Sequence, residues 1–552
     1  MKKIILIAIL ILAFLLRVPF LDRYPAGLNA DEAAIGYNAY SLIKTGLDEH
    51  GTPWPSVFRS FDDYKPAVYF YLVLPFVYFM GLSVTAVRLP SALLGVISVY
   101  FIYLLANQLF SKKTPQGWPQ GLPWGGLVAA LLLAISPWHL HFSRGGWEAN
   151  AASAFMVIGL YCLARSLENT KYFFVTTFSF VLALYTYHSL RIVIPLLFIA
   201  FVLIYFRDIR SILGKAGQLK PVLISVIIGF LLLLPLALQF TSAEGRSRFT
   251  GVSVFADEGP LWEALELRRE DGNTLLARVL HNRYATYTYR FAKNYLSHFS
   301  PRFLFIVGDE IARSKVPGLG QAYLFTFPFF ILGLLLMLAR NGRGEKLVLS
   351  WLLIAPVAAA LTFQSPHALR AQNMVFPLTI ITAVGIYQFF AFIFPWAKKI
   401  AVGLCLFTLI IGGYEVARYL HQYYIHYPKE LPYAWQYGFA QIAAYTKEHE
   451  SEYDRIIVSD RYDQPYILMA FFTKYPPEKF QQEIILEPRD KFGFSTVRKF
   501  AKYEFRRIDY GQDEKIRNVL IIAADEPVDN TDIVYHLKDP AGRVIWRFAK
   551  PN

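Results

Sequence analysis

The sequence is poor in cysteine and in charge. It has two cysteines in 552 residues, Cys162 and Cys405, and both lie inside apolar segments. Two such residues exclude a disulfide framework and a CxxC metal pair. Charged residues make up 17% of the chain, whereas an average soluble domain has about a quarter. These shortages argue against a disulfide-stabilised secreted protein and against an ordinary soluble enzyme.

Long apolar runs take the place of charge. Hydrophobic residues make up 55% of the chain, and apolar segments of about 20 residues recur, the length that crosses roughly 30 Å of hydrocarbon. The formal net charge of +14 would suggest a nucleic-acid partner in a soluble protein, but here it must first be divided between two sides of a membrane. The composition predicts a polytopic α-helical membrane protein with no nucleic-acid partner.

Eleven segments are predicted to cross the membrane. The amino-terminal segment is interpreted as an uncleaved first span, because no small-x-small cleavage site follows it. No internal repeat stands out along the chain. The predicted spans are about 4–21, 89–110, 124–142, 148–166, 172–188, 192–206, 221–240, 320–339, 347–363, 374–395 and 400–420.

The aromatic segment 67–82 decides the orientation. If it lies in the membrane interface rather than crossing, the short basic loops all fall on the side of the amino terminus. These loops and the terminus then carry fifteen Lys and Arg and three Asp and Glu. The bias predicts a cytoplasmic amino terminus and a carboxyl terminus outside. The short amino terminus and the lack of a retrieval signal favour a prokaryotic plasma (inner) membrane. Residues 22–88 become the first outer loop.

Residues 421–552 have a different character from the rest. Apolar runs shorten and charges return, so we predict a small extracytoplasmic α/β domain after a transmembrane domain at 1–420. The expected elements are strands at 454–460 and 518–525, a helix at 465–473, and a strand pair at 532–548 around the turn 539–543.

The unusual polar residues gather on the predicted outer side. Ionisable groups at a membrane edge are costly unless they line a polar cavity, so the set indicates a functional site, although each member alone is more simply explained by interfacial anchoring. The candidates are Asp31, Glu32, Asp63, Lys65, Arg88, Arg144, Glu148, His367 and Arg370.

This set suits chemistry on a phosphorylated lipid. A carboxylate such as Asp31 can take the proton of an attacking hydroxyl, and a lysine such as Lys65 can face the phosphate that leaves. Apolar, aromatic-rich spans can supply a groove for the lipid. The predicted cytoplasmic loops contain no Gly-rich phosphate cradle and no acidic metal pair, which argues against a nucleotide-sugar substrate.

The order of these motifs resembles a known group. Asp31 and Glu32 follow the first span, Lys65-Pro66 comes later in the same loop, RLPSALLG (88–95) opens the next span, and SPWHLHFSRGGWEAN (136–150) follows. The chain resembles the GT-C glycosyltransferases of the protein O-mannosyltransferase and lipid A aminoarabinose transferase type, most clearly over residues 1–200.

The resemblance implies an inverting transfer of a sugar from a polyprenyl phosphate to a protein, lipid or glycan acceptor on the outer face. It implies that Asp31 is the base, with Glu32 orienting or binding beside it, and that Lys65 and Arg144 face the donor phosphate. Relatives often carry Asp where this chain has Ala149, and the neighbouring Glu148 is the substitute candidate. No cofactor is certain, and a divalent metal stays open.

Three other functions compete with this interpretation. An O-antigen ligase or polymerase also works on the outer face but relies on arginine-rich loops. A transporter or flippase favours inverted repeats and ionisable residues at mid-membrane, whereas the charges here crowd at one edge. A receptor would need a cytoplasmic output domain, which the sequence does not suggest.

Overall fold

The computed structural model describes residues 1–61, 63–110, 124–239, 253–488 and 495–551; the side chain of Asp63 lies outside this description. The chain divides into two compact units. Unit 1 comprises residues Met1–Val18, Ser91–Ser143 and Glu148–Leu420, and unit 2 comprises Pro19–Pro90, Arg144–Trp147 and His421–Asn552.

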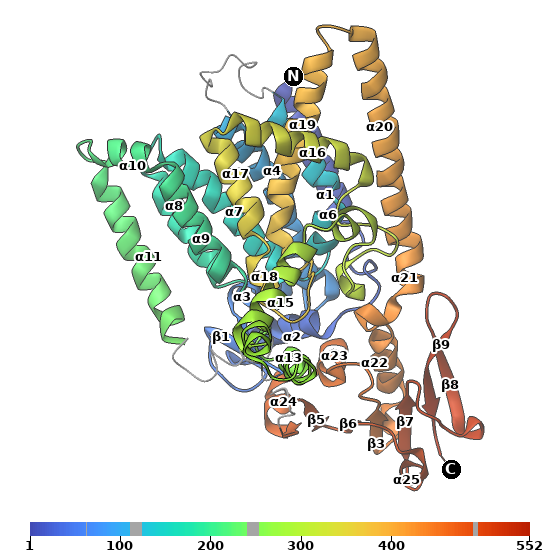
Figure 1. The fold of residues 1–552 in the computed structure, drawn as a ribbon. Coiled ribbons are helices and arrows are strands. Elements are labelled where there is room, and N and C mark those ends of the chain that lie inside the picture. Colours follow the sequence, from blue (N-terminus) through green and yellow to red (C-terminus); the bar gives the residue numbers. More distant parts are fainter. Residues whose placement is uncertain (62, 111–123, 240–252, 489–494, 552) are drawn as a thin grey trace. The chain divides into compact units, whose positions relative to one another are not determined.

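Unit 1 is built from apolar helices (Figure 1). Each of the eleven predicted spans coincides with one helix or with two consecutive helices. They are α1 (Lys2–Arg17), α4 (Val84–Phe110, which begins in unit 2), α5 (Gly125–Ile135), α6 (Pro137–Ser143), α7 (Glu148–Ser166), α8 (Tyr172–Leu184), α9 (Leu190–Ile204), α10 (Phe206–Leu213), α11 (Leu219–Gln239), α16 (Phe327–Arg340), α17 (Arg343–Ile354), α18 (Val357–Ala360), α19 (Val375–Ile393) and α20 (Lys398–His421).

Several of these helices are long and apolar enough to cross a bilayer. Among the described residues, four qualify alone: α4, α11, the segment Gln372–Ile393 and the segment Lys398–Glu430. Two bent pairs, α5–α6 at 57° and α9–α10 at 76°, bring the number to six. The polytopic membrane character is therefore confirmed, and the number eleven stays a prediction.

Two glycines allow α16 and α19 to pack closely. A Cβ atom at Gly333 would lie 2.0 Å from the carbonyl oxygen of Ile381, and one at Gly385 would lie 1.9 Å from that of Phe329. Any larger side chain would therefore push the two backbones apart. Small residues at such crossings are a common way to pack helices in membranes, where van der Waals contact drives association.

The stretch between α11 and α16 is largely helical where the structure describes it, from residue 253 on. It contains α13 (Gly259–Glu270), α14 (Leu275–Leu280), α15 (Arg283–Ser297) and a π-helical turn at Arg302–Ile306. The side chains of Thr274 and Asn282 accept hydrogen bonds from the first backbone N–H groups of α14 and α15. Such N-caps satisfy donors that have no partner inside the helix.

In unit 2, the stretch after the first span is not the simple loop that we expected. It forms α2 (Ala30–Thr45), the antiparallel pair β1 (Val57–Ser60) and β2 (Asp63–Pro66), and α3 (Val68–Met80). Helix α2 ends at Gly46, whose φ of 74° is easily adopted by glycine alone. Helix α3 covers the segment predicted to lie in the interface. Its 13 residues span about 20 Å, the same length as α8, so the interfacial position of this segment stays a prediction.

The carboxyl-terminal part of unit 2 contains a seven-stranded sheet of order β4-β5-β6-β3-β7-β9-β8. The expected strands and helix are confirmed, with β3 parallel to both β6 and β7. The short strands β4, β5 and β6 were not predicted. The elements are α22 (Phe439–Glu448), β3 (Arg455–Val458), α23 (Pro465–Thr473), α24 (Pro477–Glu483), β4 (Ile485–Leu486), β5 (Val497–Phe500), β6 (Tyr503–Phe505), α25 (Tyr510–Asp513), β7 (Val519–Ala523), β8 (Ile533–Lys538) and β9 (Val544–Ala549).

Candidate active site

The amino-terminal end of α2 positions the predicted carboxylate pair. Asn29 caps the helix: its Oδ1 accepts from the backbone N–H of Glu32 at 3.1 Å, and Glu32 Oε2 accepts from the backbone N–H of Asn29 at 3.3 Å. This reciprocal capping box fixes where the helix begins. The backbone N–H of Ala30 donates to Gln436 Oε1 at 2.6 Å, so the carboxyl-terminal segment also holds this end of α2.

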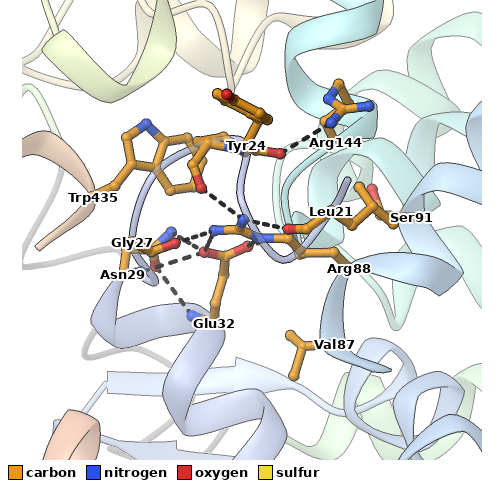
Figure 2. Close-up of polar contacts among 12 residues, drawn as sticks. Leu21, Tyr24, Gly27, Asn29, Glu32, Val87, Arg88, Ser91, Arg144 and Trp435 are labelled. Carbon is orange, nitrogen blue, oxygen red and sulfur yellow. Dashed lines mark hydrogen bonds and ion pairs between the residues drawn. The ribbon is translucent and has the colours of Figure 1, made fainter. Parts of the chain in front are cut away.

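Glu32 is buried against Arg88, which lies in the first turns of α4 (Figure 2). Arg88 Nε donates to Glu32 Oε1 at 2.8 Å and Arg88 Nη2 donates to Glu32 Oε2 at 2.9 Å. The two side chains are fully buried. A planar guanidinium that meets both oxygens of one carboxylate is among the strongest polar contacts in proteins.

The remaining donors of Arg88 go to the chain between the first span and α2. Nη1 donates to the carbonyl oxygens of Leu21 at 2.8 Å and Pro25 at 2.9 Å, and Nη2 donates to that of Gly27 at 2.7 Å. At Gly27 the backbone has φ +99°, and a Cβ atom there would lie 2.3 Å from the carbonyl oxygen of Trp435. Arg88 therefore ties α4 to the turn that precedes α2.

The glycine pair of the SRGGW sequence completes the surroundings of Glu32. The backbone N–H of Gly146 donates to Glu32 Oε1 at 2.7 Å. A Cβ atom at Gly146 would lie 3.0 Å from Val87 and 3.3 Å from Glu32 itself, so glycine permits this close approach. Parts of three of the four motifs that carry the family resemblance thus meet within unit 2: Asp31-Glu32, Arg88 and Arg144-Gly145-Gly146.

Arg144 is buried and holds the turn after the first span. Its Nη2 donates to the carbonyl oxygens of Pro19 at 2.9 Å and Tyr24 at 3.2 Å, and Figure 2 shows the contact with Tyr24. Its guanidinium also lies 5.6 Å and 5.4 Å from the ring centroids of Tyr423 and Tyr424. The predicted role of Arg144 at the donor phosphate stays a prediction.

Asp31 and Lys65 form an ion pair on the other side of α2. The Asp31 side chain is 31% exposed, whereas that of Lys65 is 6% exposed. The Lys65 ammonium also lies 4.7 Å from the centroid of the Phe61 ring, so a cation–π contact supports its position. The two residues that sequence reasoning placed at the proton and at the phosphate are therefore in direct contact.

Sequence reasoning missed two further polar residues beside this pair. Asn38 and Glu49 are buried and joined by two hydrogen bonds, from the Glu49 backbone N–H to Asn38 Oδ1 at 2.9 Å and from Asn38 Nδ2 to Glu49 Oε1 at 3.1 Å. Burial raises the pKa of the Glu49 carboxyl to about 8, and Lys65 is among the charges that lower it. The sequence signal for α2 itself is the capping-box spacing of Asn29 and Glu32, which marks the start of the helix.

Three other candidates, Glu148, His367 and Arg370, lie in unit 1, whereas Asp63 begins β2 in unit 2. Glu148 is the half-buried first residue of α7, and Arg370 is half-buried. His367 is buried, with its Nδ1 3.9 Å from Asp309 Oδ2. Burial raises the pKa of Asp309 to about 6, although the N–H groups of Ile311 and Ala368 donate to it. Within the described residues, no cluster of three or more His, Cys, Asp or Glu side chains could hold a metal ion.

Comparison with known proteins gives a sequence match and several structural matches. The sequence model of the family "Dolichyl-phosphate-mannose-protein mannosyltransferase" matches residues 64–238. Among curated proteins, no match was found. ArnT from Cupriavidus metallidurans in the apo state has a TM-score of 0.53 at 12% identity, covering 100% of this chain and 99% of that one.

Two further structures show the same relationship. ArnT from the same organism bound to undecaprenyl phosphate gives a TM-score of 0.51 at 12% identity over the same shares. The Archaeoglobus fulgidus oligosaccharyltransferase tethered with an acceptor peptide gives 0.50 at 12% identity, covering 85% of this chain and 62% of that one. These matches confirm the predicted GT-C fold, and the family description agrees with the predicted class, a glycosyltransferase.

Proposed function

We propose that this protein is an inverting glycosyltransferase that moves a sugar from a polyprenyl phosphate to an acceptor at the outer face of the plasma membrane. The observation that carries the proposal is the ion pair between Asp31 and Lys65. It is held at the start of a capped helix and is partly open to solvent. A base and a phosphate-binding cation in contact are the two groups that such a transfer needs.

In the proposed reaction, the acceptor hydroxyl attacks the anomeric carbon from the side opposite the phosphate. The new carbon–oxygen bond forms as the bond to the phosphate oxygen breaks, so the configuration inverts. Asp31 takes the hydroxyl proton during the attack. The polyprenyl phosphate leaves as an anion, and Lys65 stabilises the charge that develops on it.

Binding of the donor changes the partner of Lys65. Before binding, its ammonium pairs with Asp31; in the complex it turns to the phosphate, and the carboxylate is left to accept a proton. An ammonium on a flexible stem is suited to such an exchange, because its three donors have no fixed plane. Glu32, predicted as the second catalytic carboxylate, is proposed to orient Asp31, since it is buried on Arg88.

The remaining predicted site residues are assigned supporting roles. Arg144 is the second candidate for the donor phosphate, and Arg88 supports the site through Glu32. Glu148, Asp63, His367 and Arg370 are proposed only as candidates for acceptor or donor contacts. Residues 1–420 are proposed as the transmembrane domain and 421–552 as the extracytoplasmic domain.

Two relatives support the substrate class. One ArnT structure contains undecaprenyl phosphate, and the matching family is described as acting with dolichyl-phosphate mannose. Both ligands are polyprenyl phosphates, which supports a donor of that class here. The oligosaccharyltransferase with a tethered acceptor peptide supports an acceptor that reaches the site from water, such as a protein or glycan.

The proposed reaction is tested with purified protein and a panel of radiolabelled polyprenyl-phosphate sugars. We expect release of polyprenyl phosphate and transfer of label, both lost in Lys65→Ala while the variant stays folded and inserted. Lys65→Arg should keep a little activity, because the charge survives but the geometry does not. If only a polyprenyl diphosphate donor is used, or if Lys65→Ala transfers at the wild-type rate, the proposal is wrong.

The proposed orientation has its own test. In a variant lacking Cys162 and Cys405, a cysteine is placed at the exposed position Lys346 or at the exposed position Glu514. An impermeant thiol reagent added outside intact cells should label Glu514→Cys and spare Lys346→Cys. Labelling of Lys346→Cys from outside would mean that the segment 67–82 crosses the membrane and that every later loop lies on the opposite side from the one proposed.

A further inference from the structure

The charge of Lys65 acts on a buried carboxyl group, that of Glu49, which the reaction described above does not use. Glu49 has no exposed surface and is held by Asn38 through its backbone N–H and its Oε1. Asn38 follows Asp31 by seven positions on α2, about two turns along the same face of the helix. One helix therefore fixes both the proposed base and the anchor of Glu49.

The second carboxyl oxygen of Glu49 is unsatisfied. Oε2 is buried and accepts no hydrogen bond from any residue that the structure describes. A negative charge on such an oxygen would be costly, because no donor among the described residues compensates it. Burial accordingly raises the pKa of Glu49 to about 8. At neutral pH the side chain is therefore mostly the uncharged acid.

Several charged or titratable groups face Glu49 from the surrounding elements. They are Asp48 and His50 in its own loop, Tyr37 on α2, and Arg59 and Lys65 on the β1–β2 pair. Helix α24 contributes the neutral Gln481, whose Nε2 donates to the carbonyl oxygen of Asp48 at 2.8 Å. Lys65 is the one member of this group that also pairs with Asp31.

We propose that Glu49 is a positioning residue for Lys65. As an uncharged acid it leaves the ammonium available to Asp31 and to an incoming phosphate, and as a carboxylate it attracts the ammonium and opposes the phosphate. The inference rests on the proposed function, because it takes the ligand of Lys65 to be a lipid phosphate. It adds a proton-dependent control of donor binding to that site.

The size of the effect follows from electrostatics. A unit charge within about 10 Å of the phosphate, at an effective dielectric constant of about 20, changes binding by roughly tenfold. The affinity for the lipid phosphate should therefore fall about tenfold as the pH rises through the pKa of Glu49, about 8. The phosphate's own second ionisation lies near pH 6, so it contributes at lower pH and equally in every variant.

The test measures binding of a polyprenyl phosphate to the full-length protein in nanodiscs between pH 6.5 and 9. Wild type should lose about tenfold in affinity across this range, whereas Glu49→Gln, which is fixed in the uncharged form, should stay nearly flat. Asp48→Asn is the control, since its side-chain oxygen can still accept from the backbone N–H groups of His50 and Thr52 as Asp48 does. Because the charge of Asp48 raises the pKa of Glu49, this variant should keep the fall in affinity but shift it to lower pH.

Two outcomes separate the inference from the proposed function. If wild type binds the lipid phosphate and Glu49→Gln loses affinity with pH as wild type does, the role of Glu49 is refuted. If wild type and Lys65→Ala bind equally at every pH, the proposed phosphate site fails instead. Infrared difference spectra of wild type supply a readout independent of binding: a carboxylic-acid band should titrate near pH 8, and its absence would also refute the inference.

Discussion

Two carboxylates that are adjacent in the sequence lie in opposite environments. Glu32 is fully buried and accepts hydrogen bonds from Arg88, Asn29 and Gly146. Asp31 is partly exposed and pairs with one lysine, beside the unsatisfied acid of Glu49. We call the first group the Glu32 cluster (Asn29, Glu32, Arg88 and Gly146) and the second the Asp31 group (Asp31, Lys65 and Glu49).

The difference shows how one helix end can serve both structure and chemistry. The Glu32 cluster uses arginine, whose planar fork satisfies a carboxylate and several carbonyls at once. The Asp31 group uses lysine, a point charge that can exchange one anion for another. Substitutions in the Glu32 cluster should therefore destabilise the fold, whereas substitutions in the Asp31 group should lower activity or alter its pH dependence.

Asp31→Asn should give the largest effect on the Asp31 group. The amide keeps the size of the side chain but cannot accept the proton, so the transfer rate should fall by about two to four orders of magnitude. The melting temperature should change little, and the lipid phosphate should bind more tightly, because the amide no longer competes with it for Lys65. Transfer at near the wild-type rate would mean that Asp31 is not the base. The Asp31 group would then have no catalytic role that distinguishes it from the Glu32 cluster.

Glu32→Gln should show the opposite pattern. Removing one partner of a buried ion pair leaves the charge of Arg88 uncompensated, which costs about 3–5 kcal/mol in comparable sites. We expect a large fall in melting temperature in detergent. The double variant Glu32→Gln/Arg88→Met should recover only part of it, since that change removes both charges but leaves the carbonyl oxygens of Leu21, Pro25 and Gly27 without their donors. A Glu32→Gln protein that melts as wild type does but transfers no sugar would make Glu32 a catalytic residue.

The sequence was sufficient to predict the long apolar helices and the central strands of this chain. Long apolar runs locate helices because only a helix satisfies its own backbone in hydrocarbon, and all eleven predicted spans fall on helices. The buried strands 455–458 and 519–523 were equally clear. The edge strands β4, β5 and β6 were missed because they are two to four residues long and carry little periodicity.

The pairing of charges could not be predicted in the same way. Asp31, Lys65 and Arg144 were identified by residue type and order, but the sequence offered no means to assign Arg88 to Glu32, 56 positions away. Glu49 was missed because nothing in its neighbourhood marks a buried acid. Its burial follows from tertiary packing of α2, the β1–β2 pair and α24, which a single sequence does not reveal.

Glu49→Gln should change stability in a pH-dependent way. The pKa of this carboxyl is raised from 4.5 to about 8 in the folded protein, so between these values the folded state binds a proton that the unfolded state does not. Stability of wild type must then fall as the pH rises, by at most about 1.4 kcal/mol per pH unit from this group. Above about pH 8 the difference becomes constant.

Melting curves in detergent at pH 5 and pH 8 test this. The gain in melting temperature of Glu49→Gln over wild type should be small at pH 5 and larger at pH 8. A gain that does not depend on pH would mean that Glu49 is ionised at both pH values. The Asp31 group would then contain a buried carboxylate, as the Glu32 cluster does.

Asn29→Ala should give the smallest effect, and it acts on both groups at once. The change removes the side-chain acceptor for the Glu32 backbone N–H and the donor to Glu32 Oε2, and loss of an N-cap costs about 1 kcal/mol. The melting temperature should fall modestly, and transfer should fall severalfold because the first turn of α2 positions Asp31. Asn29→Ser keeps a capping oxygen and should retain most of both properties. If Asn29→Ser and Asn29→Ala behave alike, the cap does not position Asp31, and the packing of α2 against its neighbours alone must do so.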